Sequence, residues 1–362
     1  MSGTDLVGMR GFSKRRSQSD RITGLNWSTL LQYARAATEF TTTPPVTLPR
    51  NSFSRLSAMD TTGLPRSETM TTTDGYALAF RHYVGRHGGR TIVILIHGSA
   101  GYGAQLHMLA SAIAESGRGQ VYTLDMRGHG FSDGKPGHAV RHAEQMGDDI
   151  AEFIGFVESR TPEAPIVLGG HSAGGGLVLR FSRSPAGQRV AAYYFLAPYL
   201  GLGSPTIRPL FGGWAKVQAN RLRALSLANV LGIHRFNEAT VVSFDLSACP
   251  NREAYTTSWS FNTLLAMGPG RWAPNALGID RDKPVMVISG DRDECFYPAT
   301  YAEAFGILAP QAEVRTIADS GHWDVLVDPQ AAKITLDWLS RLFPSELSSA
   351  PSALLRSDPT PR

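Results

Sequence analysis

The sequence predicts an α/β fold, with a mostly parallel central sheet flanked by helices and an inserted helical cap. Three observations indicate this class. From about residue 67, short and continuously apolar runs recur along the chain, and a longer stretch with helical spacing follows most of them. Strands without polar alternation, joined by helical crossovers, form parallel sheets covered on both faces. One long interval interrupts this alternation of apolar runs and helical stretches. The 362 residues suffice for one large domain with appendages, or for two modest domains.

The first predicted element of the sheet is a hairpin over 69–84, where Asp74 and Gly75 form a turn between two arms rich in β-forming residues. The apolar runs that follow are predicted strands: TIVILIHG (91–98), QVYTLDMRG (120–128), APIVLGGHS (164–172), AAYYFLAP (191–198), KPVMVISGD (283–291) and AEVRTIADSG (312–321). The last predicted helix covers 329–343. These elements assign the α/β domain to residues 67–198 and 283–343.

The interval 199–282 is too long for a single crossover and is rich in Leu, Trp and Phe. We interpret it as an inserted, mostly helical cap. Residues 344–362 are rich in Ser and Pro and are predicted to form a flexible tail.

Residues 1–66 are predicted to be a basic appendage rich in Ser, Thr and Pro. Within it, residues 25–40 carry apolar side chains at near-helical spacing and predict one amphipathic helix. Such a helix either docks on its own domain or contacts a membrane surface. A chain start at Met59 or Met70 is another interpretation of this segment.

Composition excludes several classes of protein. The 35 basic and 31 acidic residues give a formal charge of +4, which is small for a nucleic-acid-binding protein. Cys249 and Cys295 cannot form a disulfide framework, and no metal-ligand spacing is present. No run approaches the roughly 18 apolar residues of a membrane span, and the sequence after the basic cluster at 14–16 is too polar for a signal peptide. We expect a cytoplasmic protein with neither metal nor cofactor, peripheral at the membrane if the N-terminal segment binds lipid, and of undetermined oligomeric state.

A Gly-x-Ser-x-Gly motif, Gly170–Gly174, joins a predicted strand to a predicted helix. No Lys follows as in a Walker-type phosphate loop, and the glycines lack the dinucleotide-binding spacing. At so sharp a turn the serine lies in strained backbone, and its small neighbours keep the strand and the helix from clashing. The motif therefore predicts Ser172 as an exposed nucleophile.

A serine nucleophile requires a base and a third group that orients the base. Asp291 and Asp293 follow one predicted strand in GDRDECF, and His322 follows the next strand in SGHWD. Because reactive groups gather at the C-terminal edges of parallel strands, these sites can converge with Ser172. The residues alone leave both aspartates as candidates.

The motifs HGSAGYG, DMRGHGFSDG, GGHSAGG, SGDRDECF and SGHWD resemble those of α/β hydrolases, in particular the monoacylglycerol lipase, lysophospholipase and serine aminopeptidase-like branch. The resemblance covers residues 67–343. It implies Ser172 as the nucleophile, His322 as the general base and Asp293, three residues after Gly290, as the acid. Asp291 is then a turn residue.

The resemblance also implies an oxyanion hole, formed by the main-chain N–H groups of Ser99 and Ala173. His97 would hold the Ser99 loop by a hydrogen bond, and His171 would point away from Ser172, under the turn. Three further polar residues would brace the floor of the site: Arg127, His129 and Ser132.

The cap carries many large apolar side chains and few charges between Trp259 and Pro274. This favours an apolar cleft that accepts an acyl chain or an aromatic ester, and it disfavours a sugar or an aminopeptidase substrate. We predict a cofactor-independent serine hydrolase that cleaves monoacylglycerol or lysophospholipid esters through an acyl-enzyme. The alternatives are a broad carboxylesterase, a lactonase or a cofactor-free perhydrolase and, in another class, a catalytically weak ligand-binding protein.

Overall fold

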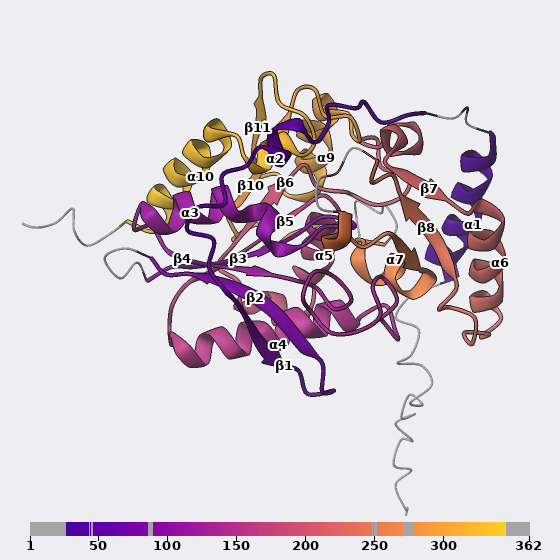
Figure 1. Cartoon of the computed structure of the whole chain (residues 1–362), viewed down its shortest axis with the longest axis horizontal. Coiled ribbons are helices and arrows are strands. Elements are labelled where there is room, and N and C mark those ends of the chain that lie inside the picture. The colour runs from indigo at the N-terminus through magenta and orange to yellow at the C-terminus, as the bar shows by residue number, and fades with distance from the viewer. Residues whose placement is uncertain are drawn as a thin grey trace, which may run out of the picture.

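A computed structural model of the chain describes residues 27–42, 44, 46–85, 90–247, 249, 252–270 and 278–344. Its main sheet has eight strands in the order β1-β2-β4-β3-β5-β6-β10-β11 (Figure 1). The strands are β1 (Ser67–Thr71), β2 (Ala77–Tyr83), β3 (Ile92–Ile96), β4 (Gln120–Leu124), β5 (Ile166–His171), β6 (Ala192–Leu196), β10 (Val285–Gly290) and β11 (Glu313–Ile317). The β1–β2 and β2–β4 pairs are antiparallel, and every other pair in this sheet is parallel. The predicted hairpin and the six predicted strands all form, with β1 beginning two residues before the predicted hairpin range.

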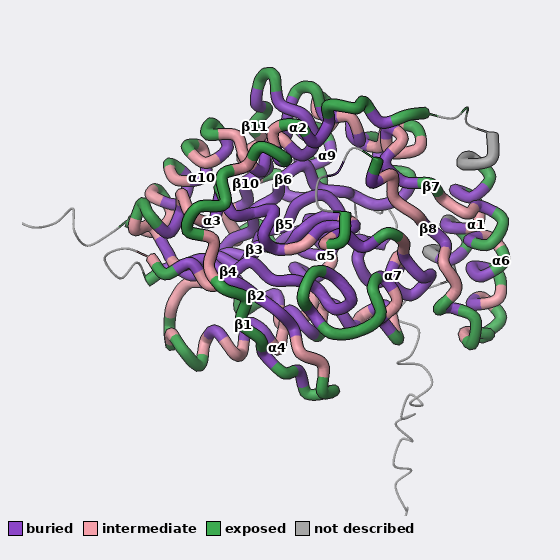
Figure 2. Tube along the Cα trace, in the orientation of Figure 1, coloured by how far each residue is buried: buried purple, intermediate pink, exposed green. Residues whose placement is uncertain are grey.

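Helices cover both faces of the central parallel strands, which explains why these strands are largely apolar, whereas the edge strand β11 carries exposed Arg315 and Thr316. All residues of β3 and β5 are buried, as Figure 2 shows for the centre of the molecule. The covering helices are α3 (His107–Glu115), α4 (Gln145–Arg160), α5 (Ala173–Phe181), α9 (Tyr301–Leu308) and α10 (Pro329–Leu342). α3 packs against α10, and α4 packs against α5. The fold class predicted from the sequence is thereby confirmed.

The insertion between β6 and β10 contains helices and a second sheet. Its helices are α6 (Ala219–Val230) and α7 (Phe261–Met267), and its antiparallel sheet consists of β7 (Ala215–Val217), β8 (Thr240–Phe244) and β9 (Ser258–Ser260). This sheet is not predicted from the sequence, and the insertion is less helical than expected. Strands of three residues, such as β7 and β9, are too short for an alternating pattern to be recognised.

Short 3-10 helices lie in the connections, at Gly103–Leu106, Pro185–Arg189, Pro209–Gly213, Arg252–Ala254, Pro298–Thr300 and Asp324–Leu326. Among the described residues, no helix has the length and apolar character needed to cross a membrane. The predicted tail lies outside the described residues, apart from position 344.

The N-terminal segment contributes α1 (Trp27–Thr42) and the short helix α2 (Ser54–Ser57). The predicted amphipathic helix over 25–40 therefore forms as α1. It packs against α6, and the two helices lie side by side at the right of Figure 1. Its buried side chains include Leu30, Tyr33 and Ala37, so the cap occupies the apolar face of α1.

Candidate active site

Ser172 lies at the turn between β5 and α5, with φ 52° and ψ −119°. A positive φ is strained for a residue other than glycine. Two main-chain hydrogen bonds hold the turn, from Ser172 N to Leu196 O (2.9 Å) and from Tyr199 N to Ser172 O (2.9 Å). A Cβ atom at Gly174 would overlap the main-chain oxygen of His97, so this motif glycine is required by close packing. The strained geometry predicted for Ser172 is present. The predicted exposure is wrong: Ser172 is 5% exposed, because the cap residues Trp214 and Trp259 enclose the cavity into which it opens.

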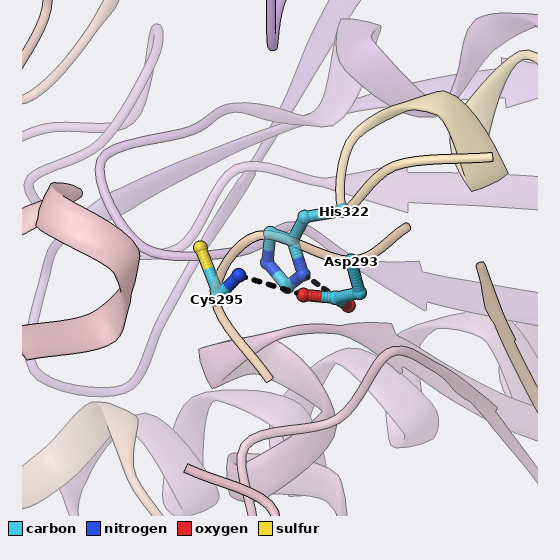
Figure 3. A group of neighbouring side chains, drawn as sticks. All are labelled: Asp293, Cys295 and His322. Atoms are coloured by element: carbon cyan, nitrogen blue, oxygen red, sulfur yellow. Dashed lines mark hydrogen bonds and ion pairs between the residues drawn. The ribbon is translucent and has the colours of Figure 1, made fainter. Parts of the chain in front are cut away.

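Asp293 and His322 form a buried pair on neighbouring loops, after β10 and β11 respectively. Asp293 Oδ2 lies 2.8 Å from His322 Nδ1, and each residue is 1% exposed (Figure 3). Asp293 Oδ1 accepts the main-chain N–H groups of Cys295 (2.8 Å) and Phe296 (2.7 Å). A carboxylate at Nδ1 favours the tautomer that is protonated there, and Nε2 then remains as the basic nitrogen.

The two candidate aspartates have different surroundings. Asp291 is exposed, and its carboxylate accepts the main-chain N–H of Ser320 at 3.4 Å. It therefore stabilises a turn, whereas Asp293 points inward and contacts His322. The cap residue Arg208 supports the inward loop, since its Nε donates to the carbonyl oxygens of Asp293 and Phe296, each at 2.9 Å.

Two further residues, Glu294 and His171, hold the main chain of His322. Glu294 Oε2 accepts the N–H of His322 at 2.7 Å, and His171 Nε2 lies 3.0 Å from the carbonyl oxygen of His322. Burial holds the pKa of His171 well below its usual range, so its neutral ring donates this bond. His171 precedes Ser172 in the sequence, and Glu294 follows Asp293. This adjacency to the predicted catalytic residues is the signal that could have indicated both.

The predicted oxyanion residues Ser99 and Ala173 line the same cavity as Ser172. Ala173 is the first residue of α5, where main-chain N–H groups have no partner within the helix and the helix dipole is positive. The cap reaches the Ser99 loop, because Trp214 Nε1 donates to Ser99 Oγ at 2.9 Å. His97 braces the same loop: Nδ1 lies 2.8 Å from Gly98 O, and Nε2 accepts the N–H of Met126 at 3.1 Å.

The polar residues after β4 form a buried framework below the site, as the sequence predicted. Arg127 Nε donates to Asp149 Oδ2 at 2.7 Å, and its Nη1 donates to Asp74 Oδ2 at 3.0 Å. His129 Nε2 accepts the indole N–H of Trp259 at 2.9 Å. The Ser132 hydroxyl donates to the carbonyl of Asp125 at 2.5 Å. These residues connect the floor to the cap.

Buried neutral histidines make the stability of this framework depend on pH. Burial lowers the pKa of His97 to about 4 and that of His129 to about 3, from 6.5. Below pH 6.5 the unfolded chain therefore binds protons that the folded chain does not. Each such group removes up to ~1.4 kcal/mol from the free energy of unfolding per pH unit as the pH falls towards its folded pKa.

We predict that His129→Asn reduces this pH dependence by about 1 kcal/mol per pH unit between pH 6 and 4. The asparagine oxygen can still accept the Trp259 N–H but does not titrate. Denaturant unfolding at several pH values measures the slope. His142→Asn, at a surface position that is 36% exposed, is the control for replacing a histidine outside the buried framework. Equal slopes for wild type and His129→Asn would contradict the prediction.

A cavity extends from Ser172 into the cap, with about 600 Å³ of empty space including its opening to solvent. Large apolar cap residues line it, among them Leu202, Phe211, Trp214, Leu222, Trp259 and Leu264. No acidic or basic side chain is among the described residues of its lining. Leu231 and Phe236, by contrast, are exposed. The cavity therefore suits an uncharged, apolar group.

Asp293, Cys295 and His322 are also the group of potential metal ligands found in the described part of the chain, with ligand atoms within 4.8 Å of one another (Figure 3). Burial raises the pKa of the Cys295 thiol well above its usual range, so the thiolate needed for metal binding is disfavoured. Both carboxylate oxygens of Asp293 already accept hydrogen bonds. This donor set does not fit a metal ion.

A family model described as serine aminopeptidase S33 matches residues 88–330, which is more than half of the chain. The chain belongs to this family. The resemblance to α/β hydrolases inferred from the motifs is therefore confirmed. Members of the serine aminopeptidase S33 family need not share a substrate, because function depends on the site rather than on the fold.

The relatives of this S33 chain include lipases. It is similar to the monoacylglycerol lipase of Mycolicibacterium smegmatis, with 34% identity over 99 residues, which is 27% of this chain and 35% of that lipase. It also resembles the structure of a soluble variant of the monoglyceride lipase of Saccharomyces cerevisiae, with TM-score 0.60 and 16% identity over 78% of this chain and 96% of that one. The monoacylglycerol lipase structure from Paleococcus ferrophilus gives TM-score 0.50 and 19% identity over 73% and 99% of the two chains. Both structural matches show a shared fold.

Proposed function

We propose that this protein is a serine hydrolase that cleaves uncharged carboxylic esters with an apolar acyl chain, such as monoacylglycerols. The observation that carries the proposal is the position of Ser172, in a strained turn at the base of an apolar cavity. The buried Asp293–His322 pair supplies the base that a serine nucleophile needs.

In the proposed reaction, Ser172 Oγ attacks the ester carbonyl carbon while His322 Nε2 takes its proton. The negative oxygen that develops is stabilised by the main-chain N–H groups of Ser99 and Ala173. The tetrahedral intermediate collapses, the C–O bond to the alcohol breaks, and His322 returns the proton to the leaving alcohol. Water then attacks the acyl-enzyme with His322 again as base, which releases the carboxylic acid and restores Ser172.

The lining of the cavity favours one class of substrate. An aminopeptidase requires an acidic group for the substrate ammonium, and the described lining residues contain none. A neutral acyl chain loses little by leaving water, and its burial contributes about 0.8 kcal/mol per methylene. The relation to a monoacylglycerol lipase supports the same class. Lysophospholipids share the acyl chain and differ in the charged head group.

The test combines labelling with a substrate panel. A fluorophosphonate probe should modify Ser172, as identified by mass spectrometry of the labelled peptide. The full chain should hydrolyse monoacylglycerols faster than lysophospholipids, lactones or aminoacyl anilides. Binding of a fatty acid without labelling of Ser172 and without turnover of any ester would favour a ligand-binding protein and overturn the proposal.

A further inference from the structure

We propose that Tyr33, on the N-terminal helix α1, forms the distal wall of the acyl-chain cavity and limits the length of the acyl chain that binds. This inference rests on the proposed function and adds a specificity-determining residue to it. Tyr33 lies well outside the family match, which begins at residue 88.

Tyr33 is a member of the cavity lining together with Ser172. Its side chain is 1% exposed and shares the lining with Leu222 of α6 and Leu264 of α7. The cavity is therefore bounded by two cap helices and by a helix that precedes the catalytic domain in sequence. Figure 1 shows how this arises, since α1 lies alongside α6 at the outer end of the cap.

The helices that carry the lining residues indicate which end of the cavity Tyr33 closes. Ser172 lies at the turn before α5, whereas Tyr33 is on α1, which packs against α6 of the cap. In Figure 1, α1 and α6 lie at the edge of the molecule, and α5 lies nearer its centre. Tyr33 therefore closes the end of the cavity that is remote from Ser172.

The Tyr33 hydroxyl has no hydrogen-bond partner among the described residues, although it is buried. Burial raises the pKa of Tyr33 to about 12, so the hydroxyl is neutral. An unpaired buried hydroxyl costs about 1–3 kcal/mol, which a phenylalanine would avoid. The ring of Tyr33, rather than its hydroxyl, therefore forms the wall, and a phenylalanine at this position should close the cavity equally well.

Contacts of α1 and of the residues around α2 hold the described part of the N-terminal segment in place. Arg223 of α6 donates to Thr38 Oγ1 at 3.0 Å. Further along, Phe53 is fully buried, with its ring centroid 5.5 Å from that of Trp214 in the cap and 4.1 Å from that of Trp323. Arg55 then donates to Asp328 at 2.9 Å. The wall is therefore fastened to the cap on one side and to the loop of His322 on the other.

The experiment compares full-length variants on p-nitrophenyl esters from butyrate to palmitate. Tyr33→Ala should raise the ratio of kcat/KM for palmitate to that for butyrate by about tenfold or more. The reason is that one additional methylene in an apolar pocket changes kcat/KM by about tenfold or more. Tyr33→Phe keeps the size of the wall and should retain the wild-type profile. Leu30→Ala is the matched control, because Leu30 is buried on the same helix but does not line the cavity.

An unchanged profile for a folded Tyr33→Ala protein would overturn the proposal, and so would an equal shift in Leu30→Ala, which would indicate a loosened helix. Thermal unfolding reports whether each variant folds. Tyr33→Leu, a smaller loss of volume, replaces Tyr33→Ala if that variant does not fold.

A binding measurement separates this proposal from the proposed function. Saturated fatty acids of increasing length displace a fluorescent fatty acid from the Ser172→Ala protein, with and without Tyr33→Ala. If Tyr33→Ala shifts the preferred length of the bound fatty acid, Tyr33 limits the chain length even if the wild type hydrolyses no ester, and only the proposed function fails. If Tyr33→Ala leaves the preferred length unchanged while the wild type hydrolyses esters, the role of Tyr33 is overturned and the proposed function stands.

Discussion

Replacing Ser172 with alanine is expected to lower kcat/KM on p-nitrophenyl butyrate by about 10⁴–10⁶-fold. The substitution removes the attacking oxygen and leaves the cavity, the Asp293–His322 pair and the main-chain N–H groups in place. The residual rate would come from the oxyanion donors and from binding alone. Alanine also carries a Cβ atom, so the strain at the positive φ of 52° is the same as with serine. The substitution therefore gives the backbone no new reason to change its conformation.

A matched serine on the same structural unit provides the control for this prediction. Ser182 caps the C-terminal end of α5, and its buried hydroxyl donates to Leu179 O at 2.8 Å. Ser182→Ala removes a similar hydroxyl almost three turns away, and it should leave kcat/KM within about twofold of wild type. A comparable loss in both variants would assign the effect to folding of α5, and full activity of Ser172→Ala would contradict the mechanism.

The turn that holds Ser172 was predictable because its constraints are local. Five consecutive residues, Gly170–Gly174, specify a strained serine between two glycines that face other main-chain atoms. The strands were predictable for a similar reason, since burial on both faces requires a continuous apolar run that is visible in the sequence. In both cases the information lies within one segment.

The choice between Asp291 and Asp293 could not be made from strand alternation. The two residues are two positions apart, and in a continuing strand they would point to the same side. In the structure the strand ends at Gly290, and the main chain turns so that the N–H groups of Cys295 and Phe296 draw the Asp293 carboxylate inward. The resemblance to a family indicated Asp293, whereas the geometry explains why it is the one that meets His322.

The contribution of Tyr33 to the cavity was not predictable from the sequence. Its segment is rich in Ser, Thr and Pro and was predicted to be an appendage to the catalytic domain. The spacing of apolar residues in α1 indicates that one face is buried, but it contains no information on which surface covers that face. The partner, α6, lies about 190 residues further along the chain, a distance at which pattern reasoning cannot pair two helices.

Replacing Asp293 with asparagine is expected to lower kcat by about 10⁴-fold. The reason follows from the two N–H groups that bind Oδ1. They require an acceptor, so the amide oxygen of asparagine should take the place of Oδ1 and its NH₂ group should face His322 Nδ1. An NH₂ donor at that position forces the ring proton onto Nε2, which then cannot accept the proton of Ser172.

Asp291→Asn is the matched control, because it makes the same chemical change on the same loop at an exposed carboxylate. It should retain kcat within about twofold, as surface substitutions usually have small effects. Steady-state kinetics on one ester, with thermal unfolding to verify folding, measures both variants. If the two substitutions lower kcat equally, the orienting role of Asp293 is wrong. If Asp291→Asn alone lowers it, the acid of the triad is Asp291, and the buried Asp293–His322 bond has only a structural role.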